Sequence, residues 1–279
     1  MSEKEYPLKL NPDYYVVTAN DLIKGRQKMS LREAQLLFIA ISQVVREDKD
    51  FKTYTTTVAE LASFMGDSPE NLYRDLKGIC KSLCQQVVEV QIGGTNSRGK
   101  AKWKVFSWVQ SAEYDSGKLT LRLSDDIKPY LLELDKYYTQ TQLGTLMTFR
   151  SYYTTRLYQY LRADTGAKWE NVEEWHFSCE ELRELFLVKE KQYTRAYNLI
   201  QKTIVPALEE LSKSDYAYVW DYEEHRASKR GRPLTGVSFK AMFFQSKEEK
   251  EHYINRVIPT VERIYGTDKS QITLETLED

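Results

Sequence analysis

The chain repeats itself once, and this internal repeat constrains its fold more than any other feature. The segment that begins at Thr57 aligns without a gap on the segment that begins at Ser178, at an offset of 121 residues. The same offset places Ser30 on Ser151. Unrelated helices would not hold one register over three segments, so the constant offset indicates a duplicated structural unit. We therefore expect two copies of one fold in tandem.

Each copy is predicted to begin with three helices. A hydroxyl residue followed three positions later by a glutamate marks a helix N-terminus, and three such pairs occur: Ser30 with Glu33, Thr57 with Glu60, and Ser178 with Glu181. The third helix of the first copy follows Ser68, with Pro69 at the first helical position, where no N–H is needed. In the second copy we expect the third helix over residues 192–211, with Pro206 kinking it or ending its first half.

Sequence typical of β-strands follows each third helix. Residues 85–94 and 101–110 flank a turn in the first copy, and residues 215–224 and 234–244 flank one in the second. A helix-turn-helix followed by a two-stranded hairpin makes a winged helix. The predicted fold class is therefore α+β, mostly helical, with two tandem winged-helix domains related by the repeat. A further hairpin over residues 111–124 is expected to extend the first sheet.

The repeat and the composition together divide the chain into four expected segments. These are a flexible N-terminus over 1–13, a first winged-helix domain over 14–125, a second one over 126–246, and a charged tail over 247–279. The tail is expected to be weakly helical.

Residues 93–101, GGTNSRGKA, match most of the pattern of a nucleotide-binding phosphate loop. Gly94 and the Gly99-Lys100 pair have the required spacing, but Ala101 replaces the Ser or Thr that would hold a metal ion. The residues that follow alternate and include Trp, Val and Phe, which predicts a strand where a phosphate loop requires a helix. The stretch is therefore interpreted as the wing tip of the first winged helix, with Arg98 and Lys100 facing DNA phosphates.

The second copy carries the stronger candidates for DNA contact. A helix in the major groove must present donors and acceptors outward, with Arg, Asn and Gln suited to bases and Lys and Thr suited to phosphates. The predicted outward-facing residues of the third helix are Lys191, Gln192, Thr194, Arg195, Asn198 and Lys202. The predicted wing adds the basic residues Arg226, Lys229, Arg230 and Arg232, whose contribution would depend on salt. The simpler interpretation of both sets is a solvated polar surface.

The first copy is predicted to bind DNA more weakly. Its candidates are side chains of the third helix and the following turn, namely Asn71, Arg74, Lys77, Lys81, Arg98 and Lys100. Glu70 and Asp75 lie on the same helix and would oppose phosphates.

The sequence offers no pattern for catalysis or for a metal site. The three histidines form no His-x-His pair, which a metal-dependent nicking endonuclease would need, so the tyrosines are not interpreted as strand-cleaving nucleophiles. Cys80 and Cys84 lie one helical turn apart near an apolar stripe, and are expected in the core rather than in a zinc site. We expect no enzymatic activity, cofactor, metal or small-molecule substrate.

Composition indicates the compartment and the limits of any charge-driven binding. An odd and sparse set of three cysteines suits a reducing cytoplasm. The sequence has no run of 18 apolar residues and no apolar leader core, so no contact with a membrane is expected. Because the net charge is −1, a DNA-binding surface must depend on local clustering of basic residues.

Three stretches resemble the initiator replication proteins of iteron-containing, theta-replicating plasmids. They are VVTANDLIKGRQKMSLREAQLLFIAIS from Val16, SYYTTRLYQYL from Ser151, and YTRAYNLIQKTIVPALEEL from Tyr193 followed by KRGRPLTGVSF. The resemblance covers roughly residues 14–245, and the second stretch is its most specific part.

This resemblance implies two winged-helix domains that bind directly repeated sites in duplex DNA at a plasmid origin. It implies that the origin is opened for the host initiator and helicase, with monomers initiating and dimers repressing the protein's own promoter, a form of copy control. The C-terminal domain would read the repeat, and the N-terminal domain would touch the backbone and mediate dimerisation. The base-reading residues that it implies are Lys191, Gln192, Thr194, Arg195 and Asn198, with Lys229, Arg230 and Arg232 in the wing.

Two other functions are compatible with parts of the pattern. A transcriptional repressor could use the same winged helices, and the sequence does not separate it from an initiator that represses its own gene. A nicking replication enzyme or an NTPase would require catalytic groups that the residues do not supply.

Overall fold

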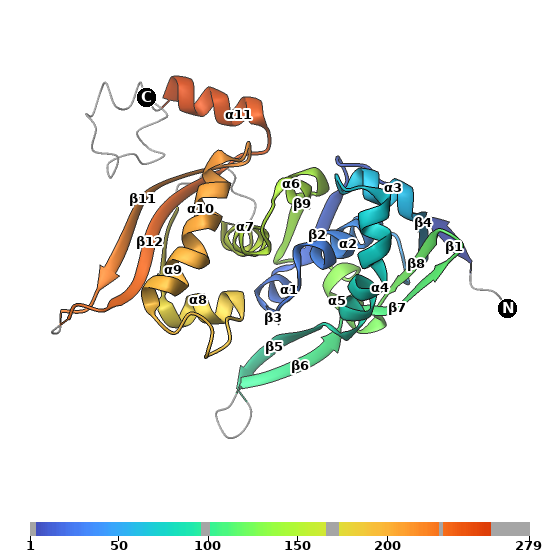
Figure 1. Ribbon diagram of the computed structural model, residues 1–279, viewed down its shortest axis with the longest axis horizontal. Helices are drawn as coiled ribbons and strands as arrows, with labels where there is room; N and C mark the ends of the chain where they lie inside the picture. Colours follow the sequence, from blue (N-terminus) through green and yellow to red (C-terminus); the bar gives the residue numbers. More distant parts are fainter. Residues whose placement is uncertain (1–3, 96–100, 166–172, 229–230, 258–279) are drawn as a thin grey trace. The chain divides into compact units, whose positions relative to one another are not determined.

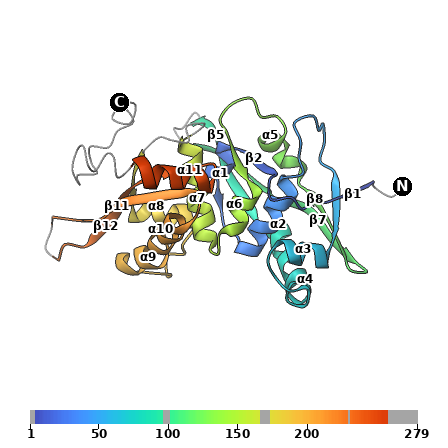
Figure 2. The same ribbon diagram turned by 90° about the horizontal axis from the view of Figure 1, so that it is seen from above.

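A computed structural model describes residues 4–95, 101–165, 173–228 and 231–257 (Figures 1 and 2). The chain divides into two compact units, Met1–Thr155 and Arg156–Asp279. Helices and strands are mixed in both units, and each unit contains a winged helix. The predicted fold class is therefore confirmed.

The first unit contains nine strands and several helices in its described residues. The strands are β1 (Glu5–Pro7), β2 (Tyr15–Ala19), β3 (Arg26–Gln27), β4 (Thr53–Thr57), β5 (Val87–Thr95), β6 (Ala101–Ser107), β7 (Val109–Asp115), β8 (Lys118–Leu123) and β9 (Tyr138–Gln142). The helices are α1 (Asn20–Lys24), α2 (Leu31–Ile41), α3 (Val58–Phe64), α4 (Pro69–Gln85), the 3-10 turn η1 (Asp125–Ile127), α5 (Lys128–Leu131) and α6 (Leu143–Thr148).

The second unit begins within α7 (Tyr152–Thr165), because the first turn of this helix belongs to the first unit. Its remaining elements are β10 (Glu173–Ser178), α8 (Cys179–Phe186), α9 (Ala196–Lys202), α10 (Ile204–Lys213), β11 (Ala217–Arg226), β12 (Leu234–Phe243), α11 (Lys247–His252) and η2 (Tyr253–Val257).

The expected helix starts are confirmed by their hydrogen bonds. The Thr57 hydroxyl accepts from the Glu60 backbone N–H at 3.2 Å, and the Glu60 carboxylate accepts from the Thr57 N–H at 3.1 Å. The Ser178–Glu181 pair makes the same two bonds in the second unit, at 3.1 and 2.7 Å. These caps stop α3 and α8 from fraying, because they satisfy N–H groups that have no partner inside the helix. The helices begin at equivalent positions of the repeat.

The order of strands identifies the wing of each unit. In the second unit β10 leads into α8 and pairs with β12, giving the order β10-β12-β11. In the first unit β4 leads into α3 and pairs with β8, and the order β1-β4-β8-β7 contains the same arrangement. The hairpin β7–β8 is therefore the counterpart of the wing β11–β12 (Figure 1).

The hairpin formed by β5 and β6 lies in a different sheet. These strands pair with each other as expected, but their sheet has the order β3-β5-β6 and shares no strand with the first winged helix. The prediction that residues 93–101 form the first wing tip is therefore wrong, as is the prediction that residues 111–124 extend the same sheet. The hairpin is inserted between α4 and the true wing, and the repeat cannot reveal it because the aligned segments end with the third helix.

A two-stranded sheet accounts for the position of the unit boundary. β9 pairs antiparallel with β2, so Tyr15 lies opposite Gln142 and Ala19 opposite Tyr138. The segment of β9 and α6 is thereby part of the first unit, although it lies beyond residue 125, the boundary expected from the repeat. The contact-based division falls after Thr155 instead.

Helix α7 carries two buried arginines within the core of its unit. The Arg156 Nε donates to the Leu185 carbonyl at 3.3 Å. The Arg162 guanidinium lies 5.5 Å from the centre of the Phe243 ring and donates to the Thr165 hydroxyl at 2.8 Å. Burial of a cation is tolerated only where its N–H groups and charge find such partners. These contacts fix α7 against β12 and the end of α8.

Candidate nucleic-acid interface

The turn between α8 and α9 forms an exposed polar surface on the second winged helix. Helix α8 ends at Phe186, its C-cap residue Leu187 has the left-handed φ of 43°, and α9 begins only at Ala196. Within the turn, the Arg183 guanidinium donates to the carbonyls of Gln192 and Tyr193 at 3.1 and 2.5 Å. A forked donor that holds two successive carbonyls fixes the path of the backbone there. The surface is thus built by the packing of a turn against α8.

The predicted start of this helix is wrong by four residues. Lys191, Gln192, Thr194 and Arg195 were assigned to the helix but lie in the turn before it, and Arg195 is the N-cap residue. Tyr193 has a φ of 52°, a left-handed conformation that a helix cannot include. Of the predicted helix residues, only Asn198 and Lys202 lie on α9.

The turn and α9 nevertheless bring most of the predicted residues to the surface. Lys191, Thr194, Arg195, Asn198 and Lys202 are exposed, and Gln192 is half-buried. Tyr197 is 58% exposed beside them, which sequence reasoning left open, whereas Leu199 and Ile200 on the other face are buried. The arrangement presents cationic, amide and hydroxyl groups together with one aromatic ring.

The expected interruption by proline is confirmed. Helix α9 ends at Lys202, the residue four positions before Pro206, and α10 begins at Ile204. The intervening Thr203 leaves the helical conformation, with φ of −124° and ψ of −73°. The proline ring clashes with the carbonyl four residues earlier and lacks the N–H that would bond to it, so the helix breaks there.

The wing of the second unit is less basic than its turn sequence indicates. The exposed Arg226 lies 3.3 Å from the Glu224 carboxylate and donates to the Arg232 carbonyl at 3.4 Å. Glu224, which sequence reasoning did not include, partly neutralises the wing because it precedes the turn on the same strand. Arg232 is exposed at the base of the turn, where it has a φ of 39°. Lys229 and Arg230 lie outside the described residues.

Helix α4 of the first unit presents a mixed surface. The Arg74 side chain donates to the Asn71 amide oxygen at 3.2 Å and to the Asp75 carboxylate at 2.9 Å. This guanidinium holds the pKa of Asp75 below its ordinary value, so the acid stays ionised and offsets the charge of Arg74. Lys77 and Lys81 are exposed and form no ion pair with the described residues. Their charges are therefore more available to an anionic ligand than that of Arg74.

The remaining candidates of the first unit, Arg98 and Lys100, lie outside the described residues, between β5 and β6 in the sequence. On β6, Lys102 and Lys104 are both exposed, and Lys104 forms an ion pair with Asp126 at 3.0 Å. Because this hairpin is not the wing, its basic residues and those of α4 belong to separate elements.

The cysteines and histidines do not gather into a metal site within the described ranges. No group of three or more His, Cys, Asp or Glu residues with suitable geometry occurs there. Cys80 and Cys84 are half-buried on α4, and burial raises the pKa of the Cys80 thiol to about 11. A separate property of the described helices is that none is long and apolar enough to cross a membrane.

Comparisons with known proteins agree with two winged helices. Residues 15–162 match the family described as "Initiator Replication protein, WH1", and residues 178–241 match "Initiator Rep protein, WH2". A replication initiation protein of Escherichia coli is 26% identical over 230 residues, covering 81% of this chain and 68% of that protein. The crystal structure of Pi initiator protein in complex with iteron DNA superposes with a TM-score of 0.64 at 19% identity, covering 85% of this chain and 100% of that chain.

Proposed function

Because the chain belongs to the initiator replication protein family, we propose that it starts plasmid replication by binding direct-repeat (iteron) duplex DNA at the origin. The observation that carries this proposal is the surface made by the α8–α9 turn and α9. It presents Thr194, Arg195 and Asn198 directly after the two backbone carbonyls that Arg183 holds in place. A prearranged set of donors and acceptors is what recognition of base edges requires. The structural relative solved with iteron DNA supports the same class of target.

The proposed division of labour follows from the chemistry of these side chains. Arg195 and Asn198 are suited to base edges because each can make two hydrogen bonds to one base. Lys191, Thr194 and Lys202 are suited to phosphates, and Gln192 to either. In the wing, Arg226, Lys229, Arg230 and Arg232 would follow the DNA backbone. We assign the reading function to the winged helix of the second unit, which begins after Thr155.

The first unit, which extends to Thr155, is proposed to contact the DNA backbone and to form the homodimer. The candidates on α4 are Asn71, Arg74, Lys77 and Lys81, and those of the inserted hairpin are Arg98 and Lys100. Arg74 is the weakest of them because Asp75 engages its guanidinium. The monomer would initiate, and the dimer would repress the protein's own promoter.

Origin opening is proposed to follow binding without catalysis by this chain. Occupied repeats would destabilise the neighbouring duplex and recruit the host initiator and helicase. No cofactor, metal or small-molecule substrate takes part in this proposal. The protein would act in the cytoplasm, where plasmid DNA is replicated.

Titration by mobility shift tests the proposal directly. The probe is a duplex with the direct repeats that flank the gene, and the control is the same duplex with each repeat scrambled. Specific binding should be tighter than binding to the control by roughly a thousandfold or more. Equal affinity for the two duplexes would contradict sequence-specific reading. Loss of replication in a plasmid from which the gene is deleted would separate an initiator from a repressor.

A further inference from the structure

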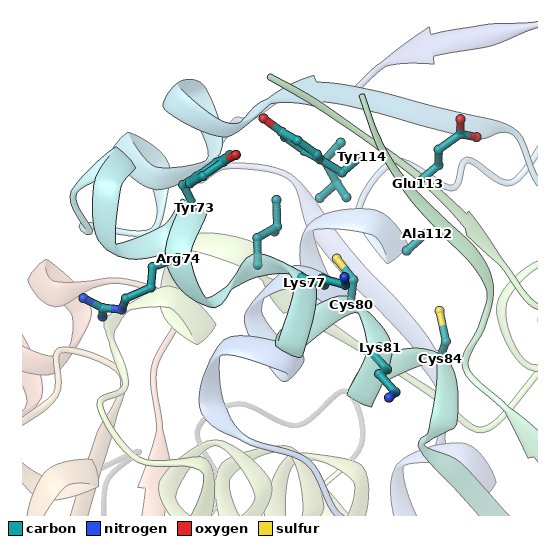
Figure 3. Close-up of a pocket in the computed structure, with 11 residues that line it drawn as sticks. Tyr73, Arg74, Lys77, Cys80, Lys81, Cys84, Ala112, Glu113 and Tyr114 are labelled. Atoms are coloured by element: carbon teal, nitrogen blue, oxygen red, sulfur yellow. The ribbon is translucent and has the colours of Figure 1, made fainter. Parts of the chain in front are cut away.

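A groove runs between α4 and β7 on the first unit. Its volume is about 740 Å³, and its apolar floor is formed by Leu76, Cys80, Cys84, Ala112 and Leu119 (Figure 3). Figure 3 shows the two thiols turned toward the side of β7. The groove lies beside the first wing and is formed entirely by elements of one winged helix.

One stripe of α4 makes the wall of this groove. Tyr73, Lys77, Cys80 and Cys84 are spaced by four, three and four residues, so they lie along one side of the helix. The adjacent stripe, which includes Leu72 and Leu83, is buried in the core. Tyr73, Cys80 and Cys84 on the stripe that lines the groove widen the apolar face of α4 beyond the side that is buried in the core.

Two tyrosines close one end of the groove and remain accessible. The rings of Tyr73 and Tyr114 meet edge to face, with centroids 5.6 Å apart. Tyr73 is 59% exposed and Tyr114 is 44% exposed. Large exposed aromatics next to an apolar floor are typical of surfaces that bind a partner.

The border of the groove is mainly cationic. Lys77 and Lys81 lie four residues apart on the α4 side, both exposed and without an ion pair to the described residues. Arg74 points away from Tyr114 in Figure 3 and is bonded to Asp75. Glu113 is the acid that lines the groove, on the β7 side. A complementary ligand therefore carries carboxylates along the side that meets α4.

We propose that this groove binds an acidic amphipathic helix of a partner protein. From Tyr73 to Cys84 the wall spans roughly 17 Å, given 1.5 Å per helical residue, which accommodates about three turns of a second helix. Apolar side chains one turn apart on this second helix would pack in the groove over Cys80 and Cys84. Carboxylates along one side of the same helix would form ion pairs with Lys77 and Lys81. An amphipathic helix in an apolar groove is a common mode of peptide recognition.

Two other kinds of ligand fit the groove less well. DNA backbones are bound through polar contacts to phosphates, and the floor here is made of leucine, alanine and cysteine side chains. Small-molecule sites bury most of their ligand's surface, whereas the two tyrosines at the end of this groove, Tyr73 and Tyr114, are themselves 59% and 44% exposed. The acidic helix uses both the apolar floor and the free lysines.

Selection from a displayed library of random peptides of about 16 residues, roughly four helical turns, tests the proposal on the full-length protein. Wild-type protein is the target, and the Ala112→Leu variant, which fills the floor, is the counter-selection. Thermal unfolding of this variant checks that it is folded. Peptides with apolar residues one turn apart and flanking Asp or Glu should be enriched. No enrichment, or enrichment without acidic residues, would overturn the proposal.

Charge variants provide a second test that does not alter the core. The Lys77→Gln/Lys81→Gln double variant should bind a selected peptide roughly three- to tenfold more weakly, because two exposed ion pairs are lost. The matched control is Lys213→Gln/Lys247→Gln, which removes the same charge from the second unit and should bind as wild type. Equal weakening in both variants would mean that overall charge attracts the peptide, and the assigned site would be wrong.

The native thiols report where the peptide binds. Alkylation at about pH 9, followed by mass spectrometry, should be slowed at Cys80 and Cys84 by the peptide and unchanged at Cys179, which lies in the second unit. The raised pKa of Cys80 makes the alkaline condition necessary. Unprotected Cys80 and Cys84 would overturn the assigned site. Direct-repeat DNA should weaken peptide binding, because Lys77 and Lys81 are also proposed to contact the DNA backbone.

Discussion

Arg183 determines the shape of the surface that is proposed to read DNA, although it is not itself a candidate for base contact. Its guanidinium holds the carbonyls of Gln192 and Tyr193, so replacement by methionine keeps the length of the side chain but releases the turn. We expect Arg183→Met to lower specific affinity by about tenfold, since two charge-assisted hydrogen bonds that prearrange the site are lost. Mobility-shift titrations at several salt concentrations measure this, and the salt dependence should stay as in the wild type. A shallower salt dependence would instead identify Arg183 as a phosphate contact.

Arg195 is the strongest candidate for a base contact because it is exposed immediately before α9. We expect Arg195→Ala to reduce binding to the repeat by about 1–3 kcal/mol and to relax the preference at one base position. Titration of a set of single-base variants of the repeat reveals that position. A loss of affinity shared equally by all sequences would show that Arg195 binds a phosphate.

The start of α9 illustrates which single-residue properties a sequence can disclose. Exposure of Asn198 and burial of Leu199 follow from helical periodicity and could be predicted. The left-handed Tyr193 could not, because it depends on Arg183, which lies ten residues earlier and reaches its carbonyl only in the folded chain. Sequence periodicity therefore predicted which residues are exposed here, but it placed the residues of the turn in a helix.

At the scale of elements, the tight pairing of β12 with β10 depends on a glycine. A Cβ at Gly236 would lie 2.3 Å from the Phe177 carbonyl oxygen and 3.0 Å from the Ser178 Cα, both in the backbone. We expect Gly236→Ala to destabilise the second winged helix by about 2 kcal/mol or more, because the two strands must separate. Thermal or denaturant unfolding followed by circular dichroism measures the change.

The matched control for this substitution is Gly78→Ala on α4. A Cβ at Gly78 meets nothing within 4 Å, and the position lies inside a helix. Alanine should therefore stabilise the first unit, by about 0.5–1 kcal/mol, through its higher helix propensity. Opposite signs for the two substitutions are expected, and destabilisation by both would contradict the described packing of α4.

Helix starts and wings also differ in whether they depend on residues that are close together or far apart in the sequence. Helix starts at Thr57 and Ser178 could be predicted because a capping box depends on residues three positions apart. The first wing could not, because it is defined by the pairing of β4 with β8, strands about 65 residues apart. In sequence order the inserted hairpin β5–β6 comes first after α4, so it was taken for the wing.

At the scale of the whole molecule, the two copies of the repeat share more than the aligned segments. The pairing of β2 with β9 joins the segments that precede the two winged helices, and α1 and α6 follow these strands in the same way. Because of this pairing, the segment before α7 belongs to the first unit. The sequence repeat alone does not predict this. The repeated fold was predictable from sequence because each copy has its own local signals, whereas the association of these flanking strands is a long-range property.

The near-neutral charge of the chain leads to a prediction about salt. With a net charge of −1, the molecule as a whole does not attract DNA, so binding must depend on the cations grouped around the α8–α9 turn. Each phosphate contact contributes about 0.9 to the slope of log affinity against log salt concentration. We expect Lys202→Gln to reduce this slope by about that amount, for specific and scrambled DNA alike, because Lys202 is exposed on α9 and suited to a phosphate. Lys213→Gln removes the same charge from α10 and should leave the slope unchanged. An equal reduction in both variants would mean that net charge rather than the grouped cations governs the affinity.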